Sequence, residues 1–349
     1  MSKLLCFVSA FRSDNVAPIA PEILRAIDAA NHGLAASYGD DECSALLNRK
    51  FSDLFETDVT VFPVSTGTAA NALSLATCAR PYGAIYCHEE AHIYTSEGGA
   101  TEAFSGGAKL IALAGDQGKL PPQIVADTLK HAERGITNRP QSDAVSITQA
   151  TEYGTVYRRD ELAAFGAIAR EAGIRFHMDG ARFANALVAL GCSASEMSWR
   201  SGVDILSFGA TKNGVMGTEA IVVFDRELVE QLSYRLRRAG QTWSKMRFAA
   251  AQLIAYVEDG LFLRLASRAN ELASRLGREL AAVPGVRLMA PVEANLVFVG
   301  LPQQTIEALA AAGVRFARRG GGVIRLVTRF NGTKDEIDEF VALVRRLIG

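Results

Sequence analysis

Two residues of opposite charge stand in settings that suit chemistry. Lys212 lies within DILSFGATKNGVMGTEAIVVF, residues 204–224, where small residues separate two apolar, strand-like runs. Asp179 ends the apolar run of FHMDGAR, 33 residues before Lys212. A carboxylate at the C-terminal end of a parallel strand points into the crevice where α/β sheets bind ligands. Taken singly, Lys212 also fits a turn lysine, and Asp179 fits a helix N-cap.

Together the two residues suggest a covalent cofactor site. Burial favours the neutral form of a lysine, and a neutral amine can form a Schiff base. An aspartate nearby can hold a pyridine nitrogen protonated. Pyridoxal phosphate enzymes require this combination, so Lys212 and Asp179 predict pyridoxal 5'-phosphate as the cofactor.

A second stretch, PVSTGTAANAL, residues 63–73, suits a phosphate. A strand-like run ends there, hydroxyl residues and Gly67 follow, and a helix begins. Free N–H groups at a helix N-terminus bind anions, and the hydroxyls of Thr66 and Thr68 add donors. For this stretch alone, an ordinary N-cap turn is the preferred explanation. The Gly-rich fingerprints of nucleotide-binding proteins are absent.

Two histidines, His88 and His92, lie four residues apart in CHEEAHIYTSEGGA. That spacing would allow a metal on one helical face, but the sequence provides no evident third ligand, so we expect no metal. A position over the face of a cofactor ring is the better use for one of the two histidines, and His88 also fits a surface histidine.

The elements that must position these residues alternate along the chain. Strand-like runs lie at 58–65, 84–89, 109–115, 144–150, 174–180, 204–210 and 219–225, with helix-like runs among them. This order predicts an α/β fold: a mostly parallel seven-stranded sheet with helices on both faces. The turn between the last two runs is too short for a parallel crossover, so one strand should run antiparallel.

The pattern changes near residue 227: long helical stretches cover 226–240 and 245–283. Strand-like and helix-like runs then alternate again up to the last residues. We expect a large domain over 1–250, including an N-terminal arm over 1–20, and a smaller α+β domain over 251–349.

The composition points to an ordinary globular enzyme-sized chain. Its 349 residues are 49% hydrophobic, with a formal net charge of -1, which favours neither nucleic acid nor a membrane surface as a partner. The five scattered cysteines predict thiols in a reducing cytoplasm rather than a disulfide framework.

These motifs, with RSDN (12–15), YGDD (38–41) and IRLVT (324–328), occur in an order that resembles the L-threonine aldolases, in particular their low-specificity bacterial branch. This family belongs to the β-eliminating lyase group of fold-type I pyridoxal phosphate enzymes. The resemblance covers nearly the whole chain.

The resemblance implies a role for each matching residue. Lys212 would carry the cofactor, Asp179 would face its ring nitrogen, and His92 would stack on the ring. Thr66, Gly67 and Thr68 would bind the phosphate, and Arg182 would lie near the ring oxygen or the substrate carboxylate. Ser13 and Arg325 would bind the substrate carboxylate. Tyr38 would reach the site of a neighbouring subunit, and Arg237 or Arg247 would contact the phosphate across a dimer. Without the resemblance, Arg325 also fits a sheet-edge charge and Ser13 a turn residue.

Two positions depart from the family pattern. Glu152, in TQATEYGTVY, stands where many members have a histidine that faces the substrate's β-hydroxyl, and Arg329 replaces a histidine after VT. The base that removes the β-hydroxyl proton is therefore open among His92, Glu152 and a bound water.

The reaction implied is the cleavage of L-threonine, L-allo-threonine and related β-hydroxy-α-amino acids to glycine and an aldehyde. A phenylserine-type aldolase, a β-eliminating lyase or an aminotransferase would use the same pocket. A pyridoxal-binding regulator and a nucleotide-binding α/β protein are rivals from other classes. By resemblance the protein would be a homo-oligomer, at least a dimer and expected to be a tetramer.

Overall fold

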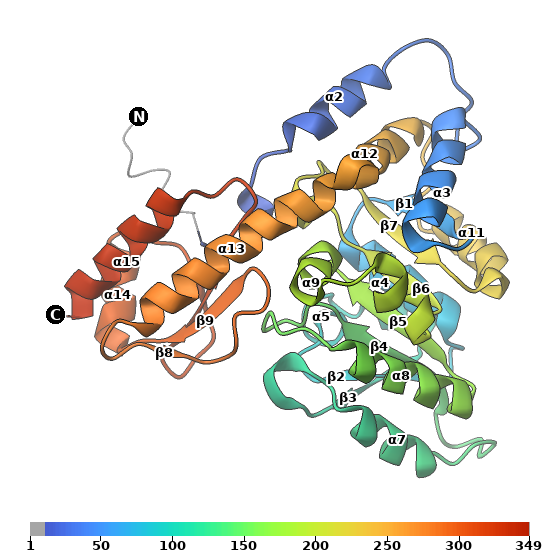
Figure 1. The fold of residues 1–349 in the computed structure, drawn as a ribbon. Coiled ribbons are helices and arrows are strands. Elements are labelled where there is room, and N and C mark those ends of the chain that lie inside the picture. The colour runs from blue at the N-terminus through green and yellow to red at the C-terminus, as the bar shows by residue number, and fades with distance from the viewer. Residues whose placement is uncertain (1–10, 349) are drawn as a thin grey trace.

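The computed structural model describes residues 11–348 (Figure 1). The expected N-terminal arm therefore lies partly outside the described residues. Within them, no helix is both long and apolar enough to cross a membrane.

The larger sheet has seven strands in the order β1-β7-β6-β5-β4-β2-β3. Strand β7 runs antiparallel to both β1 and β6, and the other pairs are parallel. The predicted sheet, with one antiparallel strand, is confirmed. The strands are β1 (Thr60–Val64), β2 (Gly83–His88), β3 (Lys109–Leu113), β4 (Gln141–Thr148), β5 (Arg175–Gly180), β6 (Ile205–Phe208) and β7 (Glu219–Val223).

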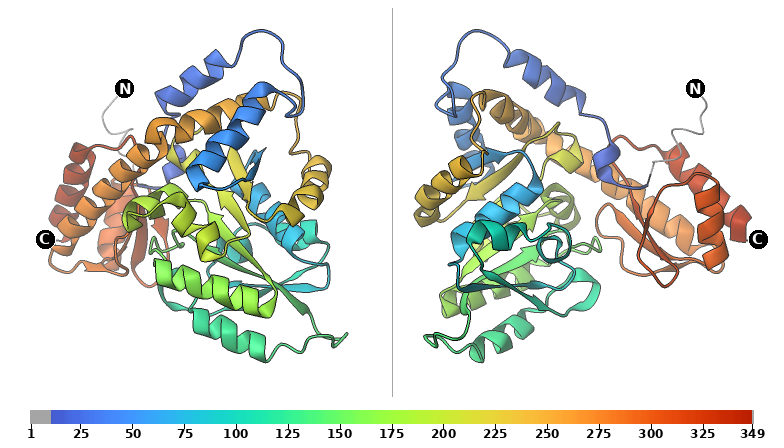
Figure 2. Two further views of the ribbon diagram at one scale, coloured as in Figure 1. Left: turned by 45° about the vertical axis from the view of Figure 1, so that its right-hand side comes forward. Right: turned by 180° about the vertical axis from the view of Figure 1, so that it is seen from behind.

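Helices cover both faces of this sheet, which is why its central strands are apolar on both sides (Figure 2). On one face the core includes side chains of α3, α8, α9 and α12; on the other it includes those of α4 and α11. The helices of this part are α2 (Pro21–Ala29), α3 (Glu42–Phe55), α4 (Gly67–Cys78), α5 (His92–Thr95), α6 (Ala100–Ser105), α7 (Pro122–Lys130), α8 (Arg159–Ala172), α9 (Phe183–Leu190), α10 (Ala194–Met197), α11 (Val229–Arg238) and α12 (Arg247–Val257).

The helix expected over 245–283 is two helices. A short 3-10 turn, Glu258–Gly260, separates α12 from α13 (Leu261–Ala281). Asp259 and Gly260 have positive φ angles of 50° and 67°, a conformation that ends a right-handed helix. The apolar periodicity continues across the break, so periodicity alone did not reveal it.

The smaller sheet is antiparallel, with the order β10-β11-β9-β8. Its strands are β8 (Arg287–Leu288), β9 (Leu296–Gly300), β10 (Ala317–Arg318) and β11 (Val323–Val327), and its helices are α14 (Gln303–Ala311) and α15 (Lys334–Ile348). The long helix α13 runs from the large sheet to this second core (Figure 1).

The domain division at residue 251 stays a prediction. Buried side chains from Ala250 to Ala266 pack in the core of the large sheet, whereas most of those from Leu272 to Val344 pack in the core of the small sheet; Ala294 and Phe330 return to the large core. We propose that the two domains divide within α13.

Candidate active site

A cavity of about 540 Å³ opens at the C-terminal ends of the parallel strands, and Arg319 and Arg325 of the small domain also line it. Ten of the predicted site residues line it: Ser13, Thr66, Gly67, Thr68, His92, Glu152, Asp179, Arg182, Lys212 and Arg325. They come from seven separate segments of the chain, so the fold brings together what the sequence scatters.

Asp179 lies at the end of β5, next to Ser207 of β6 in register, and is 3% exposed. Its Oδ2 accepts a hydrogen bond from Nδ2 of Asn71, and its Oδ1 accepts one from the N–H of Ala181, both at 2.9 Å. The following helix α9 has Arg182 at its N-cap position, with no side-chain cap bond. Asp179 is therefore held as a buried carboxylate at the cavity rather than as a helix cap.

Lys212 lies in the 3-10 turn Thr211–Asn213 directly after β6. Its Nζ has no hydrogen-bond or ion-pair partner among residues 11–348. Buried Glu219, at the start of β7, accepts hydrogen bonds from the N–H and hydroxyl of Thr211 and from the N–H of Ala210. These bonds fix the turn and leave the amine free to react.

The turn between β1 and α4 has the form expected of an anion site. Thr66 is the N-cap of α4, and its Oγ1 accepts a hydrogen bond from the N–H of Ala69 at 3.1 Å. A Cβ added at Gly67, the first residue of α4, would meet nothing within 4 Å. The first N–H groups of a helix have no intrahelical partner, so those of Gly67 and Thr68 are available to an anion.

His92 begins the short helix α5, and its Nδ1 lies 2.9 Å from Oε1 of Glu97. The same oxygen accepts a hydrogen bond from Nδ2 of Asn71, which also binds Asp179. The hydrogen bond to Glu97 raises the pKa of His92, although burial acts in the opposite sense. Asn71 thus links the environment of His92 to that of Asp179.

Glu152 reaches the cavity from the loop after β4. Its Oε1 accepts hydrogen bonds from the N–H of His92 and the hydroxyl of Thr148, both at 2.9 Å. Its Oε2 is buried and has no hydrogen-bond partner among the described residues. Burial, with a contribution from the charge of Asp179, raises the pKa of Glu152 to about 7.

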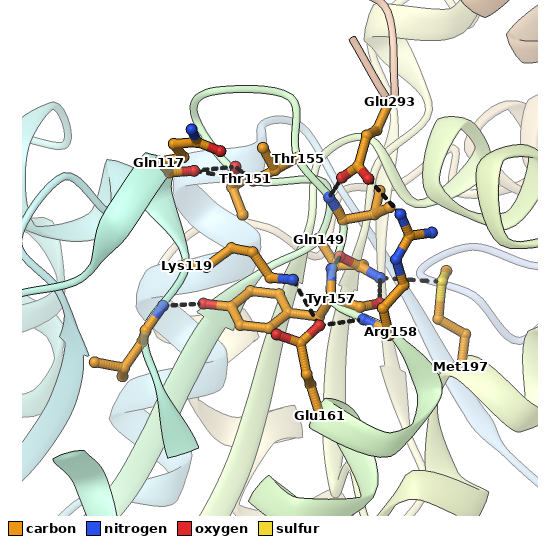
Figure 3. Close-up of polar contacts among 12 residues, drawn as sticks. Gln117, Lys119, Gln149, Thr151, Thr155, Tyr157, Arg158, Glu161, Met197 and Glu293 are labelled. Atoms are coloured by element: carbon orange, nitrogen blue, oxygen red, sulfur yellow. Dashed lines mark hydrogen bonds and ion pairs between the residues drawn. The ribbon is translucent and has the colours of Figure 1, made fainter. Parts of the chain in front are cut away.

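Polar contacts hold the ends of the Glu152 loop in place (Figure 3). Gln149 binds both the N–H and the carbonyl of Tyr157, at 3.0 and 3.1 Å. The hydroxyls of Thr151 and Thr155 both donate to the carbonyl of Gln117. The loop is thereby fixed on the large domain.

The small domain holds the same loop from the other side. Oε2 of Glu293 accepts a hydrogen bond from the N–H of Val156 at 2.8 Å (Figure 3). The ring of Tyr153 stacks on that of Phe298 in β9, with centroids 4.8 Å apart. The position of Glu152 therefore depends on both domains.

The arginines of the cavity differ in their partners. Arg182 donates to both carboxylate oxygens of Asp14, which is 1% exposed. Burial would raise the pKa of Asp14, but Arg182, Lys212 and Asn295 together lower it. Arg325 is different: its buried Nε has no partner within residues 11–348, and its pKa falls to about 10, chiefly through burial and then through Arg182.

Three predicted residues, Tyr38, Arg237 and Arg247, do not line the cavity of this chain. The guanidinium of Arg237 lies 4.6 Å from the centre of the half-exposed Tyr38 ring. Arg247 donates to the carbonyl of His32. Their roles toward a neighbouring subunit stay predictions.

Sequence reasoning assigned no role to Asp14, Asn71, Glu97 and Glu219. All four lie inside stretches that the sequence analysis singles out, RSDN, PVSTGTAANAL, CHEEAHIYTSEGGA and DILSFGATKNGVMGTEAIVVF. Asp14 and Asn71 act on partners from other stretches, which only the fold brings together. Glu97 and Glu219 bond to residues of their own stretches, but the sequence does not show that the chain turns back to make these contacts.

The pattern of the family described as beta-eliminating lyase matches residues 10–303. This chain belongs to that family. It is 45% identical to a low-specificity L-threonine aldolase of Pseudomonas aeruginosa, over 97% of this chain and 98% of that protein. A low-specificity L-threonine aldolase of a second Pseudomonas strain is 43% identical, over 97% of each chain.

Solved structures agree with this family assignment. A threonine aldolase of Leishmania major superposes with a TM-score of 0.90 at 28% identity, covering 98% of this chain and 99% of that one. The architecture is that of the fold-type I pyridoxal phosphate enzymes, as the sequence predicted.

Proposed function

We propose that this beta-eliminating lyase family member is a pyridoxal 5'-phosphate-dependent aldolase. Its reaction is the cleavage of L-threonine, L-allo-threonine and related β-hydroxy-α-amino acids to glycine and an aldehyde, which makes it a carbon–carbon lyase. The observation that carries the proposal is the meeting of Lys212, Asp179 and the α4 N-terminus in one cavity. The similarity to low-specificity L-threonine aldolases along the whole chain supports the choice of reaction.

The residues of the cavity fit the cofactor. Lys212 offers an amine without a competing partner in the part of the chain that the structure describes, and Asp179 is a buried carboxylate fixed by two donors. Thr66, Gly67 and Thr68 offer an anion site at a helix N-terminus. When bound, the pyridoxal ring supplies an electron sink for the electron pair released by Cα–Cβ cleavage.

In this proposal Lys212 would hold the cofactor covalently, and Asp179 would keep a proton on its ring nitrogen. His92, oriented by its bond to Glu97, would lie against the ring. Arg182 lies in the cavity wall, where Asp14 already pairs with its charge and holds the guanidinium in place.

Arg325 and Ser13 bind the substrate carboxylate. The guanidinium of Arg325 is half-buried and lacks an anion among the described residues, so a substrate carboxylate would compensate its charge. This contact orients the Cα–Cβ bond for cleavage, so a larger fraction of the bound substrate has the productive geometry.

Glu152 is the base that removes the β-hydroxyl proton. Oε1 is anchored by two donors, and the carboxylate has a second oxygen, Oε2, without a partner among the described residues. Its pKa of about 7 allows a carboxylate to accept a proton near neutrality. Nδ1 of His92 is engaged by Glu97, so Nε2 is the ring nitrogen through which His92 would act in the alternative role of base.

The absorption spectrum tests the cofactor assignment. Cofactor-saturated wild-type protein should show a visible band, glycine should shift it, and Lys212→Ala should lack it. No visible band in the saturated wild-type protein, or an unchanged band in Lys212→Ala, overturns the proposal.

We further propose that the protein is a cytoplasmic homo-oligomer, at least a dimer and expected to be a tetramer. Tyr38, Arg237 and Arg247 lie outside the cavity of their own chain, which leaves them for a neighbouring one. The thiols of Cys43, Cys78, Cys87 and Cys192 are free, as suits a reducing compartment.

A further inference from the structure

The substrate end of the cavity contains a second arginine. Arg319, which follows β10, lines the same cavity as Arg325 and is exposed. Its side chain has no hydrogen-bond or ion-pair partner in the part of the chain that the structure describes. The two guanidinium groups are close enough for the charge of Arg319 to lower the pKa of Arg325.

Strand register explains why both arginines reach the cavity. Ala317 of β10 lies opposite Arg325 of β11, and the N–H of Arg319 donates to the carbonyl of Val323. Since strand side chains alternate between faces, Arg319 shares the face of Ala317 and hence that of Arg325. Arg318 points to the other face, where it pairs with Glu307 of α14.

The charges of the cavity leave Arg319 without compensation. Arg182 is paired with Asp14, Lys212 is assigned to the cofactor, and the substrate's α-carboxylate balances Arg325. Among the lining carboxylates, Glu90 is exposed at the cavity, whereas Glu97, Glu152, Asp179 and Glu219 each accept hydrogen bonds from the protein. A threonine side chain offers no second charge for Arg319.

We propose that Arg319 binds a second carboxylate, carried on the β-carbon of the substrate. The substrate class is that of the 3-hydroxyaspartates. This inference rests on the proposed aldolase function and extends its substrate range toward anionic β-substituents.

The reaction balances without a further reactant. Glu152 takes the proton of the β-hydroxyl, the Cα–Cβ bond breaks, and the β-carbon leaves as the aldehyde carbon of glyoxylate. The electron pair of the broken bond remains with the glycine fragment, whose Cα is then protonated. The products are glycine and glyoxylate.

Ligand binding without turnover tests the role of Arg319. L-Aspartate has the second carboxylate but no β-hydroxyl, and L-asparagine is its neutral isostere. Their dissociation constants are measured on the cofactor-loaded enzyme from the change in visible absorbance. We expect wild-type enzyme to prefer aspartate by about five-fold, as for a partly exposed arginine–carboxylate pair, and the preference to shrink in high salt.

Two variants separate the possible outcomes. Arg319→Ala should abolish the aspartate preference, and Arg318→Ala, which removes the neighbouring cation on the opposite face, should retain it. In turnover, Arg319→Ala should lower kcat/KM for 3-hydroxyaspartate relative to threonine by a similar factor.

If Arg319→Ala weakens the binding of aspartate and of asparagine by the same factor, the proposal is overturned. Arg319 would then bind the α-carboxylate or pair with Glu90 across the cavity. The proposal is also overturned if wild-type enzyme shows no preference. If even glycine leaves the spectrum unchanged, the proposed function itself fails, which distinguishes the two.

Discussion

The backbone N–H of His92 donates a hydrogen bond to Oε1 of Glu152 at 2.9 Å. The two side chains that the sequence offered as alternative bases therefore belong to one arrangement. His92 and Thr148 anchor one carboxylate oxygen and leave Oε2 free of protein partners among the described residues. These two bonds hold the carboxylate in one position at the cavity.

Replacing the base should slow cleavage far more than replacing the ring that lies over the cofactor. Glu152→Gln keeps the size and the acceptor for the N–H of His92, but cannot accept the proton. We expect kcat for L-threonine cleavage to fall by about 10²- to 10⁴-fold, the usual contribution of a general base. His92→Phe keeps an aromatic face, so its kcat for L-threonine cleavage should fall by a smaller factor.

The pH profile serves as the control for this prediction. The base acts when ionised, so kcat/KM of the wild-type enzyme should rise with pH through about 7 and then level off. Glu152→Gln should lack this limb. Near-full activity in both Glu152→Gln and His92→Phe would instead assign the proton transfer to a bound water or another group.

The same carboxyl should destabilise the folded apoprotein above neutrality. Its folded pKa of about 7 exceeds the ordinary value of 4.5, so its contribution to stability is complete below pH 4.5 and is lost as the pH rises through 7. The shift corresponds to at most about 3 kcal/mol. Glu152→Gln should therefore melt at a higher temperature than wild type at pH 8, and the difference should shrink at pH 5. An equal difference at both pH values would contradict the raised pKa.

Much of the fold follows from the order of the segments. Short apolar runs alternating with helical ones define a parallel sheet, and the ten-residue connection between β6 and β7 forces the antiparallel strand. The two-residue strand β10 was not predicted, because so short a run has no period to recognise. Its position depends on pairing with β11 rather than on its own sequence.

The site could be predicted only in part, for a similar reason. Lys212 and Asp179 lie at strand ends, and strand ends can be inferred from sequence. The pairing of Arg182 with Asp14 spans 168 residues, and the bond between Asn71 and Asp179 spans 108. Such contacts depend on how elements pack, which local patterns do not encode.

Asn71 should matter for cofactor retention as well as for stability. Asn71→Ala removes the shared donor between Glu97 and Asp179, leaving two buried carboxylates without that bond. We expect a loss of about 1–3 kcal/mol in the free energy of unfolding and a weaker affinity for the cofactor. Denaturant titration and cofactor titration measure the two effects.

The matched control is Asn185→Ala, which removes another buried asparagine, one bonded to Asn270. It should lower stability and leave cofactor affinity unchanged. If both variants bind the cofactor as tightly as wild type, Asn71 has only a structural role.

Arg325 should be sensitive even to a conservative change. Arg325→Lys retains a charge but loses the planar pair of donors that matches a carboxylate, so KM for L-threonine should rise about ten-fold or more. Arg275→Lys, at a surface pair with Asp338, should leave KM unaltered. An unchanged KM in Arg325→Lys would exclude the carboxylate contact.

The most direct test of the account is product formation from L-threonine. Cofactor-loaded wild-type protein and Lys212→Ala, saturated with the same cofactor, are compared for the amounts of acetaldehyde and glycine released. We predict equimolar acetaldehyde and glycine from the wild-type protein and only background amounts from Lys212→Ala. A wild-type protein that binds the cofactor but releases no acetaldehyde, or a Lys212→Ala variant as active as wild type, would contradict the account.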